Sequence, residues 1–126
     1  MEDLKRRLVE EHRIVKVSLI GYIESILPEY KRDPNKYFEY VEGFVANIRR
    51  IQEKHFRFEE EQIFPHFSDN PLVTELRREH DHIRRMLDRI VAVSTMDEKI
   101  GLLQRLVEII RDHLHKEDEK LQQLLK

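Results

Sequence analysis

The chain has 126 residues, a length typical of one domain, and we expect a single domain over residues 1–126. Its 23 Lys and Arg against 25 Asp and Glu give a net charge of −2, which disfavours a nucleic-acid partner because phosphate binding needs a basic surface. The absence of cysteine excludes disulfides, thiolate metal sites and cysteine nucleophiles. The apolar runs are too short to span a bilayer and the first residues lack the apolar segment of a signal peptide, so we expect a cytoplasmic protein without a membrane partner.

Prolines and helix-capping residues divide the chain into four predicted helices. Pro28 is expected to end the first helix, because proline disfavours helical geometry in the residue before it. The next two helices are expected to begin at cap-and-proline pairs, Asp33-Pro34 and Asn70-Pro71. Thr95 and Glu98 form a predicted capping box that opens the last helix. The expected helices cover about residues 2–27, 34–63, 71–93 and 97–124.

Each predicted helix carries one apolar stripe at intervals of three and four residues. The third helix is an example, with Leu76, Ile83 and Leu87 on one face. No segment alternates with a period of two for long enough to predict a sheet. Four long helices with short connections predict an all-α protein, an up-down-up-down antiparallel four-helix bundle.

Four histidines interrupt these stripes, one in each predicted helix: His12, His55, His80 and His113. Two glutamates, Glu59 and Glu117, each follow one of them by four residues and therefore lie on the same helix face. At ~1.5 Å of rise per residue, all four histidines reach about the same level of an antiparallel bundle. The six side chains are therefore expected to converge on the middle of the bundle.

A metal site explains this convergence better than ordinary core packing. A lone histidine on an apolar stripe is more often a hydrogen-bonded core residue. Four histidines at one level, together with two glutamates, instead favour a metal site. Buried carboxylates without a partner are unfavourable, and a pair of divalent cations removes that penalty. Imidazole and bridging carboxylates suit iron, although these ligand types permit other metals. The remaining histidines are expected at the surface, namely His66, His82 and His115, while Gln62 is either near the cluster or at the polar edge of the stripe.

The sequence around these residues resembles the hemerythrin-like (HHE cation-binding) domain family. The resemblance spans essentially the whole chain and rests on four segments: residues 11–14, 55–65, 79–84 and 113–119. It implies a bundle holding two iron ions in a non-haem di-iron centre, with an oxo or hydroxo group completing the bridge. By position, His12 and His55 would serve one iron and His80 and His113 the other, while Glu59 and Glu117 would bridge the two. Such sites bind dioxygen at an iron with an open position.

Two positions depart from the oxygen-carrying members of that family. Those proteins have a second histidine four residues before the shared one in the third helix, where this chain has Leu76. They also use an aspartate five residues after the histidine of the fourth helix, which corresponds to Asp118. Glu117 has the better facing here, because four residues return a side chain to the same stripe. One iron would thus have one protein ligand fewer, and an open position could admit water or another ligand.

Three functions follow as alternatives from this interpretation. The first is a di-iron protein that binds dioxygen or a related small ligand for storage or sensing. The second is a di-iron enzyme or iron donor that acts on nitric oxide or peroxide, or in iron–sulfur cluster repair. The third is a structural or partner-binding bundle with an incidental metal site. The sequence names neither a protein partner nor an oligomeric state.

Overall fold

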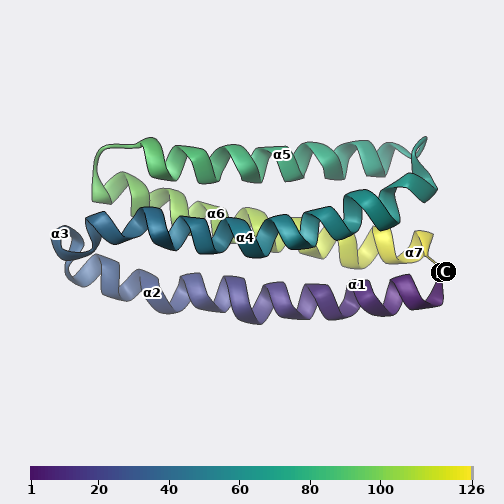
Figure 1. The fold of residues 1–126 in the computed structure, drawn as a ribbon, viewed down its shortest axis with the longest axis horizontal. Coiled ribbons are helices and arrows are strands. Elements are labelled where there is room, and N and C mark those ends of the chain that lie inside the picture. Colours follow the sequence, from purple (N-terminus) through teal and green to yellow (C-terminus); the bar gives the residue numbers. More distant parts are fainter. Residues whose placement is uncertain (126) are drawn as a thin grey trace.

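A computed structural model describes residues 1–125 of the chain. Four long helical runs lie antiparallel and side by side, with the two termini at the same end of the bundle (Figure 1). The first run comprises α1 (Glu2–Ile14), the π-helical η1 (Val15–Ile20) and α2 (Gly21–Arg32). The second comprises α3 (Pro34–Tyr37), the 3-10 turn η2 (Phe38–Tyr40), α4 (Val41–Phe58), the π-helical η3 (Glu59–Ile63) and the 3-10 turn η4 (Phe64–Phe67). The third is α5 (Pro71–Ala92), and the fourth comprises α6 (Met96–Lys116), the π-helical η5 (Glu117–Leu121) and α7 (Gln122–Leu124). The predicted all-α four-helix bundle is confirmed, and the described residues contain no strand.

The prediction that Pro28 ends the first helix is wrong. Pro28 lies inside α2, which continues to Arg32. Proline removes one helical hydrogen bond, but the extra turn buries Tyr30, whose ring packs 5.4 Å from that of Tyr37 and 5.7 Å from that of Phe44. The aromatic packing of this turn compensates for the missing bond.

The helix starts follow the predicted capping residues, with two differences in detail. The side chain of Asn70 accepts a hydrogen bond from the backbone N–H of Leu72 at 2.9 Å. Asp33 precedes Pro34 as expected, but its side chain makes no capping hydrogen bond. The hydroxyl of Thr95 accepts from the backbone N–H of Glu98 at 3.2 Å and donates to the Glu98 carboxylate at 2.9 Å, so this carboxylate does not turn back to a backbone N–H as a full capping box requires.

Two apolar clusters fill the bundle. The larger one occupies the half near α2, the start of α4 and the start of α6, and includes Leu19, Ile48 and Leu103. The smaller one, which includes Leu8, Leu76 and Leu121, lies toward the end that holds both termini. No described helix is both long enough and apolar enough to cross a membrane.

Candidate metal centre

Six polar side chains are buried together in the bundle, and we call them the inner cluster: His12, His55, Glu59, His80, His113 and Glu117. Each is at most 3% exposed. Their ligand-type atoms form two groups of four, one with His12 and His55 and one with His80 and His113, and both groups include Glu59 and Glu117. Within each group the atoms lie within 4.8 Å of one another, close enough to bind one metal ion per group.

The helix period places these residues on facing surfaces. His12 lies in the last turn of α1, His55 in the last turn of α4, and His80 near the middle of α5. Both glutamates stand at the first position of a π-helical segment, Glu59 in η3 and Glu117 in η5. Single π-helical turns often occur at functional sites, because they change the direction of side chains locally.

Glu59 approaches three imidazoles from three helical runs. Its Oε1 lies 3.0 Å from Nε2 of His80 and 3.4 Å from Nε2 of His55. Its Oε2 lies 3.6 Å from Nε2 of His12. Donor atoms about 2.0–2.2 Å from one shared metal ion would lie roughly 3 Å apart, so these separations suit shared coordination.

Glu117 divides its two oxygens between the two groups. Its Oε1 lies 3.0 Å from Nε2 of His12 and 3.7 Å from Nε2 of His55. Its Oε2 faces the other side, 3.3 Å from Nε2 of His113 and 4.0 Å from Nε2 of His80. A carboxylate in this orientation can bridge two metal ions.

The unpaired polar atoms of the inner cluster fit bound cations. Among the described residues, the buried side-chain nitrogens and oxygens without a hydrogen-bond partner belong to this cluster, apart from Oε1 of Gln52. They include Nε2 of His12, His55 and His113 and both oxygens of Glu117. Because buried polar groups are normally hydrogen-bonded, such a concentration needs an explanation. Metal coordination satisfies these atoms all at once, and their identity as imidazole nitrogens and carboxylate oxygens suits iron and related metals.

Burial and mutual proximity shift the pKa values of the inner cluster in opposite directions. Burial, together with the negative charge of nearby Glu117, raises the pKa of Glu59 well above its usual value. Burial also opposes ionisation of Glu117, but its contacts with His113, Glu59 and His12 together outweigh burial and hold the pKa of that carboxyl well below its usual value. Burial lowers the pKa of His80, whereas for His113 the carboxylates of Glu117 and Glu79 overcome burial and raise the pKa to about 9. Without metal, His113 therefore keeps a proton at neutral pH that a bound cation would replace.

Four more carboxylates surround the inner cluster, and we call them the outer carboxylates: Glu11, Glu60, Glu79 and Asp118. Each directly neighbours an inner residue in the sequence, but its carboxylate points to the histidine of a different helical run. Glu79, for example, precedes His80 in α5, yet it lies 2.7 Å from Nδ1 of His113 in α6. A carboxylate on Nδ1 leaves Nε2 free for a metal and fixes the orientation of the ring.

The outer carboxylates follow one another around the bundle in a closed ring. Glu60 in η3 lies 2.7 Å from Nδ1 of His80, and Asp118 in η5 lies 2.6 Å from Nδ1 of His12. Glu11 in α1 faces Nδ1 of His55 at 3.7 Å. Together with Glu79, these contacts connect the first run to the second, the second to the third, the third to the fourth and the fourth to the first.

Cations stand behind three of the outer carboxylates. Arg84 lies 3.2 Å from Glu60, Lys16 lies 3.0 Å from Asp118, and Lys116 pairs with Glu79. His80, His12 and His113, which contact these carboxylates, are therefore each the inner end of an imidazole–carboxylate–cation chain that leads to the surface. The cation helps to keep the carboxylate ionised and able to accept the Nδ1 proton.

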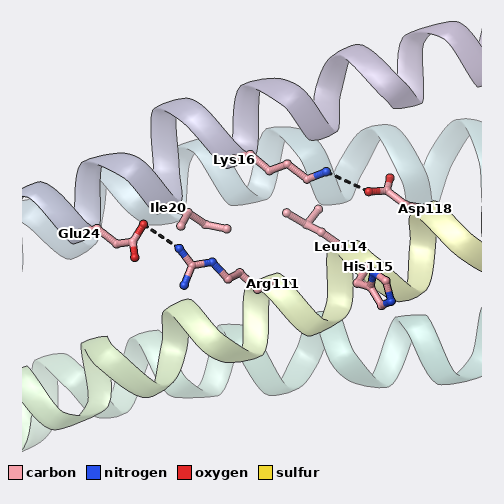
Figure 2. A pocket seen from close by; sticks show the side chains of 7 residues that line it. All are labelled: Lys16, Ile20, Glu24, Arg111, Leu114, His115 and Asp118. Atoms are coloured by element: carbon pink, nitrogen blue, oxygen red, sulfur yellow. Dashed lines mark hydrogen bonds and ion pairs between the residues drawn. The ribbon is translucent and has the colours of Figure 1, made fainter.

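One of these chains borders a surface pocket of about 320 Å³ between the first and fourth helical runs. Lys16 reaches across this pocket to Asp118, and Arg111 reaches across it to Glu24, as Figure 2 shows. Asp118 therefore has one oxygen on buried His12 and the other on a cation at the edge of the pocket. Asp118 thus both lines this pocket and contacts a residue of the inner cluster.

The comparison with protein-family models identifies this arrangement. The model of the Hemerythrin HHE cation binding domain matches residues 3–125. The chain belongs to this hemerythrin family. No curated protein and no solved structure matched the chain.

In this hemerythrin-like chain, the structure places each residue that the sequence singled out. All six predicted ligand candidates lie in the inner cluster, and the three histidines expected at the surface are exposed. Gln62 is exposed and thus belongs to the polar edge of its helix. Asp118 does not enter the inner cluster but contacts His12 from outside, which leaves Glu117 as the inward carboxylate.

Sequence reasoning missed the roles of Glu11, Glu60 and Glu79. The sequence did contain a signal for them, because an acidic residue stands directly beside an inner residue in all four helical runs of this hemerythrin-like chain.

Leu76 is fully buried in the smaller apolar cluster, one turn before His80. It offers no donor atom, so the inner cluster has one histidine for each helical run.

Proposed function

We propose that this protein is a non-haem di-iron protein that binds dioxygen or a related small ligand, for storage or sensing. His12 and His55 would hold one iron, His80 and His113 the other, and Glu59 and Glu117 would bridge them. The bound irons would supply a redox-active pair able to bind such a ligand. The protein's own residues exclude water, hold the imidazoles in place and provide two carboxylates to the pair.

The observation that carries this proposal is the orientation of Glu117. Its two oxygens face opposite halves of a cluster that is buried on all sides. A single metal ion would leave one of these oxygens and at least one imidazole without a partner, which is unfavourable in an apolar interior. Two ions would give every one of the six residues a metal to bind, and membership of a cation-binding family supports the same conclusion.

The test is metal analysis of the purified protein together with its absorption spectrum. We expect two irons per chain, one for each group of four donors. After reduction with dithionite, exposure to air should produce a new absorption band that disappears again when oxygen is removed. A protein that stays free of iron after anaerobic reconstitution would contradict the proposal.

One observation favours a second function, that of a di-iron enzyme or iron donor acting on nitric oxide, peroxide or damaged iron–sulfur clusters. Because position 76 is leucine, the His80/His113 group has only two histidines and the two shared carboxylates, as the His12/His55 group has, so both ions would have open positions. Open positions on both ions allow a substrate to contact the pair, and not only one ion. Irreversible oxidation in air, with turnover of nitric oxide or peroxide and consumption of reductant, would favour this alternative over reversible binding.

A further inference from the structure

The inner cluster has two halves with the same donor set but different surroundings. The first half contains His12 and His55, the second contains His80 and His113, and both share Glu59 and Glu117. The donor types alone give no reason for one half to bind an ion before the other. Any difference in metal affinity between the two halves must therefore come from the residues that contact and orient the histidines.

In the second half, both histidines have an outer carboxylate within hydrogen-bond distance of Nδ1. Nδ1 of His80 and Nδ1 of His113 each lie 2.7 Å from a carboxylate oxygen, of Glu60 and Glu79 respectively. In the first half, only His12 has such a contact, with Asp118 at 2.6 Å. His55 lies 3.7 Å from Glu11, beyond hydrogen-bond distance, and its buried Nδ1 has no hydrogen-bond partner.

Aromatic packing shows the same asymmetry. Phe56 stacks on His80 with ring centroids 3.8 Å apart and planes inclined by 12°. Phe64 stacks on the same imidazole at 5.5 Å, and Phe56 also meets His113 edge-on at 6.2 Å. The two histidines of each half also meet edge-on, at 5.1 Å for His12 and His55 and at 4.9 Å for His80 and His113, so this contact is common to both halves. In the first half, no phenylalanine ring among the described residues stacks on an imidazole, and Phe56 approaches His55 only at 6.3 Å with a tilted ring.

From these contacts we infer that the His80/His113 half binds its metal ion first and more tightly, and that the His12/His55 half is the exchangeable one. Ligands held in one orientation lose little freedom when an ion binds, whereas His55 must be ordered at that moment. A hydrogen bond at Nδ1 also fixes the proton there and leaves Nε2 available, and His55 lacks this control. The ring of outer carboxylates is thus weakest at the contact between Glu11 and His55.

This inference rests on the proposed metal function, and Zn²⁺ can test it without any measurement of activity. Zn²⁺ is diamagnetic, so imidazole nitrogen signals in protein labelled with ¹⁵N-histidine can be followed during a titration of the metal-free protein at one fixed pH. With half an equivalent of Zn²⁺, we expect the signals of His80 and His113 to change while those of His12 and His55 keep their metal-free positions. Calorimetry should show two steps whose affinities differ by about 10-fold or more.

Three variants assign the steps to the halves. Glu79→Gln removes the charge beside His113 and should weaken the first step by about 10–100-fold. Asp118→Asn acts on His12 and should weaken only the second step. Glu61→Gln is the matched control, since Glu61 is exposed in the same π-helical segment as Glu60 and should change neither step.

The outcomes separate this inference from the proposed function. The inference would be overturned by two steps of equal affinity, or by signals of His12 and His55 that change before those of His80 and His113. A shift of the same step by Glu79→Gln and Asp118→Asn would also overturn it, and all three results would leave metal binding intact. Failure of the protein to bind either Zn²⁺ or Fe²⁺ would overturn both.

Discussion

The ring of Phe56 lies parallel to the imidazole of His80, 3.8 Å away, and neither side chain is exposed to solvent. Phe56 belongs to the larger apolar cluster, so one residue connects the packing of the core with the orientation of a candidate ligand. The guanidinium of Arg84, which pairs with Glu60, also lies over the Phe56 ring, 5.1 Å from its centroid. Phe56 thus supports both the histidine and the charged chain behind it.

Replacing Phe56 with leucine should therefore weaken metal binding, and the loss of protein stability alone should not account for this weakening. We expect Phe56→Leu to lower the free energy of unfolding by roughly 1–3 kcal/mol, as for other reductions of core volume. Phe44→Leu, in the same apolar cluster but away from the histidines, should have a similar effect on urea unfolding. Only Phe56→Leu should weaken metal binding in a titration, and equal affinities in the two variants would contradict an orienting role.

The candidate ligands themselves can be tested by metal content. We expect His55→Ala and Glu59→Ala to reduce the iron bound per chain sharply, because each removes a donor from the inner cluster. His82→Ala is the matched control, since His82 is exposed on α5 only two residues from His80. Equal iron content in the three variants, measured by elemental analysis, would rule out the ligand assignment.

Leu76→His should have opposite effects on the metal-free and the metal-loaded protein. In the metal-free protein, a histidine in the smaller apolar cluster is a buried polar group and should destabilise folding by roughly 1–3 kcal/mol. When metal is bound, the new imidazole can coordinate one turn before His80 and recover part of that loss. Thermal unfolding with and without metal measures the difference, and metal exchange should become slower. A variant that is equally destabilised in both states would show that position 76 does not face the metal.

Metal affinity should rise with pH. In the metal-free protein the nearby carboxylates of Glu117 and Glu79 raise the pKa of His113 to about 9, so this imidazole carries a proton at pH 7, and burial raises the pKa of Glu59 in the same direction. Coordination requires the deprotonated forms, and binding therefore releases protons. Calorimetric titrations at pH 7 in buffers with different ionisation enthalpies should reveal this release. An affinity that is constant from pH 6 to 8 would contradict it.

The inner cluster should lower the stability of the metal-free protein, which distinguishes a metal site from a purely structural feature. An acid whose pKa is higher in the folded than in the unfolded state destabilises the fold at pH values above its unfolded pKa. Glu59 is such a group at pH 7. We therefore expect Glu59→Gln to increase the free energy of unfolding in the presence of a chelator by roughly 1 kcal/mol or more. In metal-loaded protein the same change should be destabilising, and a loss of stability in both states would favour a structural role.

The helix period by itself determined much of this protein. Residues four apart share a face of an α-helix whatever that helix packs against, so the pairs His55–Glu59 and His113–Glu117 could be predicted without a structure. The antiparallel order and the rise per residue then brought four histidines to one level. The surface positions of His82 and His115 followed from the same geometry, and His66 was set apart from the cluster because it follows Pro65 at the end of its helix.

Only the tertiary structure decided the features that depend on contacts between helices. Pro28 stays helical because Tyr30 finds aromatic partners in the next run, which no local rule could indicate. Asp118 turns to His12 in another helical run, while its neighbour Glu117 enters the cluster. The outer carboxylates depend likewise on how each helix is rotated against the next. These rotations are set by the packing of the whole core, and spacing along one helix carries no information about them.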